Sequence, residues 1–387
     1  MGVFLRHLLK LAQIAMDLSL YRYSLQLSLP LMLFFGFHML LGRTPEKKIF
    51  ANYLLSRRLI GTALLILAAN YSVHLFYGIR MRSVNATILM NLSTYFLCYW
   101  LFCSAMMTLL DKGYITRRRF IGHIARWLGY SALSFIVLFA PDSANVRPWC
   151  IAALAGWLVI YGLTLSARIL RTYKRAIRMF ENTHSDDIGS YIRWLSVFTY
   201  WAIGYGVSCG LLTFLPDEYV FIWILSSIPF YIYLYCRYQN YILFYELVEN
   251  AFREDFGMPD ISMGSFIDPI GTEDGIPIHH QDINKRIQRW IDAEGFRSSG
   301  ITLSDLSLEV GTNRTYLSQY INTVYGMNFR DWITDLRIEY AKSLMSQHPH
   351  MRVQEVFEAS GFQSLSHFTR IFTVKEGCSP SKWRNKR

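Results

Sequence analysis

Seven apolar runs dominate the first 245 residues of this 387-residue chain, and each is about as long as a helix that crosses a bilayer. They lie near 24–41, 59–79, 86–110, 121–141, 149–168, 192–215 and 219–242. Backbone N–H and C=O groups in lipid must be paired within the protein, which favours helices for runs of this length. Residues 23–245 are therefore predicted to form an all-α transmembrane domain of about seven helices. Whether the first run crosses the membrane stays open.

Polar side chains interrupt some of these runs, and burying them in lipid is costly. Examples are Asn70, His74 and Asn91. They are expected to form hydrogen bonds between helices, with a functional role as the alternative.

The segment that precedes these runs, residues 1–22, is apolar but interrupted by Arg6, His7, Lys10 and Asp17. No small-residue cleavage site follows it. This pattern predicts an amphipathic helix at the membrane interface rather than a removable signal peptide.

Lysine and arginine alternate between the connections that join the apolar runs. The first, third and fifth connections hold five, four and five of these residues, whereas the second, fourth and sixth hold two, one and none. Positively charged loops stay in the cytoplasm. The odd-numbered connections, and the chain after the last run, should therefore lie on the cytoplasmic side of the membrane.

The chain after the last run begins with a change in charge. Residues 246–282 carry nine acidic and one basic side chain and are rich in Gly, Pro and Asp, which predicts an acidic flexible linker. A stripe of apolar side chains with 4-3-4-3-4 spacing begins in the last run and extends into the first residues of this segment. The spacing suits either a seam between two copies of the chain or packing against the chain's own bundle. These residues are Leu234, Tyr238, Tyr241, Tyr245, Val248 and Phe252.

Two copies of one pattern occupy residues 283–387. The copies cover 302–326 and 352–377, and each has a short apolar-periodic helix, a turn glycine, a second helix and a closing glycine. The turn glycines, Gly311 and Gly361, are fifty residues apart. Two such helix-turn-helix units predict two recognition helices on one small domain, the arrangement that reads adjacent major grooves of DNA.

Polar residues mark where the helices of both units begin and which faces they expose. Thr302 and Asp305 have the spacing of a capping box, and Asn313 and Ser364 are predicted to cap the second helices. With the apolar positions turned inward, short and hydrogen-bonding side chains remain on the outer faces, where they suit phosphates and base edges. The predicted DNA-binding residues are Arg314, Thr315, Ser318, Gln319 and Asn322 in the first unit and Ser364, Ser366, His367 and Arg370 in the second.

Two strings in this region carry a family resemblance. They are LRIEYAKSLM at 336–345 and GFQSLSHFTRIFTVKEGCSPSKWR at 361–384, the second of which fits the pattern GFxSxSxFxRxFKxxxGxSPxxyR. With them, residues 283–387 resemble the DNA-binding domain of the AraC/XylS family of bacterial transcription regulators. The resemblance implies an all-helical domain of two helix-turn-helix subdomains joined by a long helix, which binds double-stranded promoter DNA and acts with RNA polymerase.

Two residues in these strings depart from the family pattern, and a third, Arg337, is assigned a structural role. Thr373 stands where the family has Lys, which weakens a phosphate contact. Trp383 stands where it has Tyr, an exchange within the core. Arg337 is expected to form a structural ion pair rather than to contact DNA.

The combined prediction is an all-α protein of the bacterial inner membrane, with a seven-helix transmembrane bundle followed by a cytoplasmic AraC-type double helix-turn-helix domain. Its predicted function is sequence-specific activation or repression of transcription. The predicted partners are promoter DNA, membrane lipid and RNA polymerase, while a homodimer and a signal sensed by the bundle are left open.

Other classes of protein fit the sequence less well. The six cysteines have no metal-ligand spacing, and no paired carboxylates or Ser/His/Asp arrangement lies in an apolar run. Neither a metal, a cofactor nor an enzymatic activity is therefore expected. The alternatives are a membrane carrier or enzyme with a regulatory tail, and an interaction protein whose tail recruits a partner.

Overall fold

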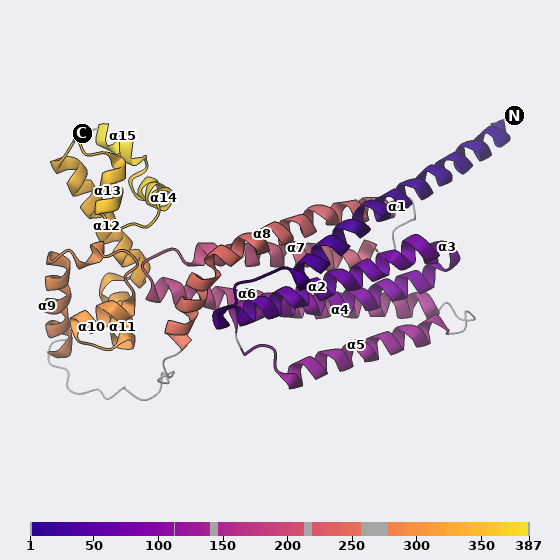
Figure 1. Ribbon diagram of the computed structural model, residues 1–387, viewed down its shortest axis with the longest axis horizontal. Helices are drawn as coiled ribbons and strands as arrows, with labels where there is room; N and C mark the ends of the chain where they lie inside the picture. Colours follow the sequence, from indigo (N-terminus) through magenta and orange to yellow (C-terminus); the bar gives the residue numbers. More distant parts are fainter. Residues whose placement is uncertain (1, 112, 140–145, 213–218, 257–277, 386–387) are drawn as a thin grey trace. The chain divides into compact units, whose positions relative to one another are not determined.

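The computed structural model describes residues 2–111, 113–139, 146–212, 219–256 and 278–385. Within these ranges every element is a helix, apart from one isolated bridge between His184 and Thr302. The chain divides into two compact units, whose helices are labelled in Figure 1. The N-terminal unit comprises Met1–Lys174 and Ile192–Glu249, and the C-terminal unit comprises Arg175–Tyr191 and Asn250–Arg387.

Long helices build the N-terminal unit, and two of them, α6 and α8, continue into the C-terminal unit. In chain order the helices are α1 (Gly2–Leu41), α2 (Ala51–Ser72), α3 (Ile79–Arg82), α4 (Val84–Leu110), α5 (Arg117–Leu138), α6 (Val146–Thr183), α7 (Gly189–Leu212) and α8 (Val220–Phe256). A 3-10 turn, η1 (Lys48–Phe50), precedes α2, and a π turn, η2 (Val73–Tyr77), follows it.

Six stretches of the described chain are long and apolar enough to cross a membrane. They are Ser19–Leu41, Lys48–Tyr77, Val84–Leu110, Arg117–Leu138, Val146–Thr183 and Val220–Phe252. The remaining predicted run, near 192–215, coincides with α7, and the residues that follow α7, 213–218, lie outside the described ranges. The count of seven therefore stays a prediction. The predicted interfacial segment and the first run form one continuous helix, α1.

Hydrogen bonds between helices connect the polar residues of the apolar runs. α2 packs against both α1 and α4. The Tyr21 hydroxyl lies 2.6 Å from His74 Nδ1, and His74 Nε2 lies 2.9 Å from Asn91 Oδ1. Asn70 Nδ2 donates to the same Asn91 oxygen at 3.1 Å. These contacts confirm the expected pairing between helices.

The 4-3-4-3-4 stripe of α8 is buried within its own chain, where each of its six residues exposes 3% of its surface or less. In the N-terminal unit, the ring centroids of Tyr238 and Tyr53 lie 5.0 Å apart. In the C-terminal unit, those of Phe252 and Phe180 lie 4.8 Å apart. Because aromatic side chains of the same chain already cover the stripe, the packing alternative is confirmed and the dimer seam is wrong.

The predicted linker, residues 246–282, overlaps helices at both of its ends. α8 continues to Phe256, because Phe252 still packs in a core, and α9 begins at Ile278. The residues between them, 257–277, lie outside the described part of the chain. The acidic, flexible character of that stretch stays a prediction.

Two hydrophobic cores joined by one long helix make up most of the C-terminal unit. The helices after α8 are α9 (Ile278–Asp292), η5 (Gly295–Arg297), α10 (Leu303–Val310), α11 (Arg314–Tyr325), α12 (Phe329–Gln347), α13 (Val353–Ala359), α14 (Leu365–Glu376) and α15 (Pro380–Asn385). α12 packs Trp332 and Ile333 into the first core and Ile338 and Met345 into the second. This is the arrangement that the family resemblance implies.

Candidate nucleic-acid interface

The first helix-turn-helix unit is fixed by the capping residues that the sequence predicts. Thr302 Oγ1 accepts a hydrogen bond from the backbone N–H of Asp305 at 3.2 Å, and Asp305 Oδ2 accepts from the N–H of Thr302 at 2.9 Å. Gly311 takes the left-handed conformation, with φ of 70°, that ends α10. Asn313 Oδ1 then accepts from the N–H of Tyr316 at 2.8 Å, so α11 begins in a set direction. These elements confirm the predicted capping box, turn and cap.

The second unit also has a turn glycine and a capping residue, and here the backbone of Arg297 approaches the glycine closely. Gly361 has a φ of 78°, and a Cβ placed on it would lie 2.2 Å from the carbonyl oxygen of Arg297. Ser364 Oγ accepts a hydrogen bond from the N–H of His367 at 3.4 Å at the start of α14. Phe368, on the inner face of α14, is fully buried. The second recognition helix is therefore anchored by a cap, a close backbone approach and a core aromatic.

The outer face of α11 carries the five residues predicted from the first unit. Thr315, Gln319 and Asn322 are exposed, while Arg314 and Ser318 are half-buried. Asn322 Nδ2 donates to the carbonyl of Ser318 at 2.9 Å, one turn earlier on the same helix. The structure thus brings these residues together on one accessible face.

The exposed side of α14 carries the four residues predicted from the second unit. Ser364, Ser366 and Arg370 are exposed, and the hydroxyls of Ser364 and Ser366 lie 2.9 Å apart. His367 is half-buried, and its ring lies 6.2 Å from that of Phe362. Burial lowers the pKa of His367 below its usual value, so near neutral pH this ring offers a hydrogen-bonding edge without a charge.

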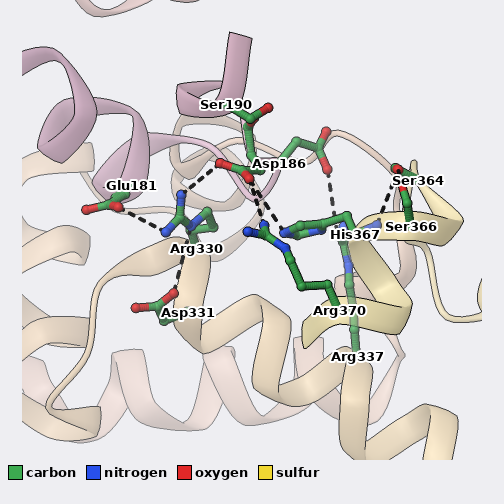
Figure 2. Close-up of polar contacts among 11 residues, drawn as sticks. Glu181, Asp186, Ser190, Arg330, Asp331, Arg337, Ser364, Ser366, His367 and Arg370 are labelled. Atoms are coloured by element: carbon green, nitrogen blue, oxygen red, sulfur yellow. Dashed lines mark hydrogen bonds and ion pairs between the residues drawn. The ribbon is translucent and has the colours of Figure 1, made fainter. Parts of the chain in front are cut away.

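Acidic residues that precede α7 form ion pairs with arginines of α12 and α14, contacts that could not be predicted from the sequence. Figure 2 shows Glu181 beside Arg330, whose Nη2 lies 2.9 Å from Glu181 Oε1. Asp187 lies between two cations, with Oδ1 3.4 Å from Arg330 Nη1 and Oδ2 3.1 Å from Arg370 Nη2. The sequence did hold one indication of this segment. Only nine acidic residues precede position 246, and three of them, Glu181, Asp186 and Asp187, lie within seven positions of one another.

Arg337 lies under this surface and is fully enclosed. Its Nε donates to the carbonyl of Phe296 and its Nη2 to the carbonyl of Ser298, both at 2.8 Å, while its Nη1 lies 3.8 Å from Asp186 Oδ1. Burial lowers the pKa of Arg337 to about 10 and raises the pKa of Asp186. The expectation that Arg337 is structural is confirmed.

Comparisons with known proteins support the assignment of this unit. A family model described as a helix-turn-helix domain matches residues 306–386. The chain is similar to the HTH-type transcriptional regulator ExsA of Pseudomonas aeruginosa, with 37% identity over 82 residues, which are 21% of this chain and 29% of the relative. The C-terminal unit carries an AraC-type helix-turn-helix domain.

Two further relatives match the chain over similar lengths. The virulence regulon transcriptional activator VirF of Yersinia enterocolitica is 32% identical over 100 residues, 26% of this chain and 36% of the relative. The transcriptional activator NphR of a Rhodococcus species is 30% identical over 107 residues, 28% of this chain and 31% of the relative. The chain therefore spans about a third of the length of these relatives, which are regulators rather than enzymes. No solved structure matches this chain.

The AraC-type domain accommodates both departures from the family pattern. The exposed Thr373 donates its hydroxyl to the carbonyl of Thr369 at 2.7 Å and so leaves no cation at this position. Trp383 packs edge-on against Phe372 at 5.9 Å between centroids and donates its indole N–H to Glu376 at 3.0 Å. The larger indole ring thus keeps both an aromatic contact and a hydrogen-bond partner.

Proposed function

We propose that this protein is a membrane-embedded regulator of transcription that binds promoter DNA through both helix-turn-helix units. The observation that carries the proposal is the pair of recognition helices, α11 and α14, each anchored by a cap and a glycine turn and each presenting a polar outer face. A membrane carrier or enzyme with a regulatory tail is disfavoured, because the relatives that match are regulators of transcription.

The exposed residues divide by the chemistry they offer to a duplex. The Gln319 amide can donate to and accept from an adenine edge, and the Arg370 guanidinium can pair with a guanine or a phosphate. The hydroxyls of Thr315, Ser318 and Ser366 suit phosphates, which position the protein, or single base edges. RNA polymerase belongs to the proposal as the partner on which a promoter-bound regulator acts.

Selection from random duplexes tests this function on the full-length chain in lipid nanodiscs. The wild type should enrich sequences with two short conserved blocks about one helical turn apart, because two recognition helices read neighbouring grooves. Gln319→Ala should lose preference in one block only, at a cost of about 1–3 kcal/mol. Gln347→Ala, the same change at the exposed end of α12, is the control and should leave both blocks intact. A wild-type chain that enriches no sequence would overturn the proposal.

The membrane part of the proposal rests on the six candidate spans, on α7 as a seventh, and on charge. Residues 175–191, which end the arginine-rich fifth connection and lead into α7, belong to the same compact unit as the AraC-type domain. This shared unit supports the proposal that the end of the fifth connection and the AraC-type domain lie on one side of the membrane. The excess of Lys and Arg in the odd-numbered connections makes that side the cytoplasm, where DNA is found.

Reporter fusions check this topology. Alkaline phosphatase, which needs export to be active, should be inactive when fused after residue 178 and active when fused after residue 82, because the two connections differ in Lys and Arg content. Fusions of β-galactosidase at the same two points should give the opposite pattern. Phosphatase activity after residue 178 would contradict the proposed orientation.

A cavity in the N-terminal unit supports the further proposal that the helical bundle receives a signal. The cavity has a volume of about 90 Å³ and is lined by residues of α2, α4, α6, α7 and α8. This is several times the roughly 10–15 Å³ that one water molecule needs. Its walls are mainly apolar, with hydroxyl groups such as those of Tyr99 and Ser166, which lie 2.6 Å apart. A small, largely apolar molecule fits this chemistry.

Native mass spectrometry of the full-length chain, released from its membrane, tests the cavity. The wild type should carry a bound molecule smaller than a phospholipid, and Ala202→Phe should remove it because the added ring fills the space. Ala125→Phe places the same ring at an exposed position of α5 and serves as the control. Equal occupancy in the two variants would exclude this cavity as the site.

A further inference from the structure

The acidic segment, residues 181–187, lies against the residues that are proposed to bind DNA. Asp187 Oδ2 is 3.1 Å from Arg370 Nη2 and 4.0 Å from His367 Nε2, and both of these side chains belong to the second recognition helix. Figure 2 shows Arg370 and His367 turned toward the acidic side chains rather than away from them. A carboxylate therefore already pairs with one guanidinium nitrogen of Arg370, Nη2, which a DNA phosphate could otherwise contact.

The contact also reaches the first residues of α12. Arg330 lies between two carboxylates, with Nη2 2.9 Å from Glu181 and Nη1 3.4 Å from Asp187. The side chains of Arg330 and Asp187 expose only 20% and 16% of their surface. Water screens such a pair less than it screens a fully exposed one, so the attraction holds the segment in a defined position.

Backbone and apolar contacts fix the segment in addition to its charges. The N–H of Ser185 donates to the carbonyl of Ile301 at 3.1 Å, and the backbone of His184 forms an isolated antiparallel β-bridge with Thr302, the cap of α10. Phe180 and Ile188, on either side of the acidic residues, are buried, and the Phe180 ring packs against Phe252 of α8. Backbone contacts at His184 and Ser185 therefore add to the ion pairs that hold the segment on the AraC-type domain.

We propose that the acidic segment is an intramolecular inhibitor of DNA binding, which lies on the side of α14 that carries His367 and Arg370 and must leave before that helix can contact a duplex. The inference rests on the proposed function. Carboxylate and phosphate groups carry the same sign of charge, so Asp187 and a DNA phosphate beside Arg370 exclude each other. The segment is chemically an acidic peptide, and its partner surface is the recognition helix of its own chain.

The position of the segment between α6 and α7 suggests how movement of these helices could regulate the inhibition. It directly joins the end of α6 to the start of α7, and both helices line the cavity of the N-terminal unit. A change in the relative position of these two helices would therefore strain or release the docked segment. Docking and DNA binding compete for one helix, so a change that weakens docking raises the undocked fraction and strengthens DNA binding, up to the affinity of the undocked domain.

DNA affinity of the full-length chain in lipid nanodiscs tests the proposal. The probe is a fluorescent random-sequence duplex of about 30 base pairs, long enough for two neighbouring helical turns. Asp187→Asn keeps the shape of the side chain but removes its charge, and should tighten binding about tenfold, within the range typical of coupled sites. Glu309→Gln makes the same change in net charge at an exposed position of α10 and should have little effect. If both variants bound DNA more tightly by the same factor, the change in net charge would explain the effect and the proposal would be overturned.

Hydrogen exchange of the wild-type chain gives an independent answer that does not depend on how a variant folds. Saturating duplex should speed exchange in residues 181–188, including the N–H of Ser185, while it slows exchange at the start of α14. Protection of α14 with no change in the acidic segment would overturn the inhibition and leave the proposed function standing. If no duplex protects α14 and Asp187→Asn also fails to bind DNA, the proposed function fails as well.

Discussion

Replacing Gly361 with Ala should disrupt the second helix-turn-helix subdomain. The added Cβ would lie 2.2 Å from the carbonyl oxygen of Arg297 and 2.7 Å from its carbonyl carbon, and these backbone atoms cannot rotate away. The left-handed conformation of Gly361 adds about 1–2 kcal/mol for a residue with a side chain. Together with about 1–3 kcal/mol for overpacking, we expect a loss of roughly 2–5 kcal/mol. Hydrogen exchange of the amides of α13 and α14 in the full-length chain measures this loss.

Gly377 provides a matched control for the steric part of this argument. It has a φ of 71°, close to the value at Gly361, but nothing lies within 4 Å of a Cβ placed on it. Gly377→Ala should therefore cost only the conformational part, about 1–2 kcal/mol. If the two substitutions destabilised the domain equally, the close approach of the Arg297 backbone would not be what requires glycine at position 361.

The local architecture of the AraC-type domain could be predicted from sequence because its signals are short in range. A capping box such as Thr302 with Asp305 acts over three residues, and a turn glycine such as Gly311 marks its own helix end. The core positions of α14 follow from apolar periodicity, and the structure buries Phe368 and Phe372 fully. None of these predictions required knowledge of contacts between residues far apart in the sequence.

Contacts between segments far apart in the sequence could not be predicted in the same way. The spacing of the α8 stripe fits two helices from different chains as well as one helix in its own bundle, and only the position of residues such as Tyr53 decides between them. The acidic segment was missed for a similar reason. Asp187 and Arg370 are 183 residues apart, and a positive-inside count weighs Lys and Arg but takes little account of nearby acids.

Replacing Arg337 with Leu should destabilise the whole C-terminal unit, because this guanidinium joins three of its segments. The substitution leaves the carbonyls of Phe296 and Ser298 without their donor and Asp186 without its counter-charge. Removing one partner of a buried ion pair typically costs about 3–5 kcal/mol. Denaturant unfolding of the full-length chain, followed by hydrogen exchange in α12, measures the loss.

Two further variants test this argument. Arg330→Leu removes a more exposed arginine that also pairs with the acidic segment, and should cost less than Arg337→Leu because water still reaches its side chain. Adding Asp186→Asn to Arg337→Leu removes the unpaired carboxylate and should restore part of the lost stability, since the two residues are coupled. Additive losses would mean that Arg337 acts only through the two carbonyls. Partial recovery would show that the acidic segment and the AraC-type domain share one buried electrostatic contact, so that displacing the segment alters the stability of the domain that it covers.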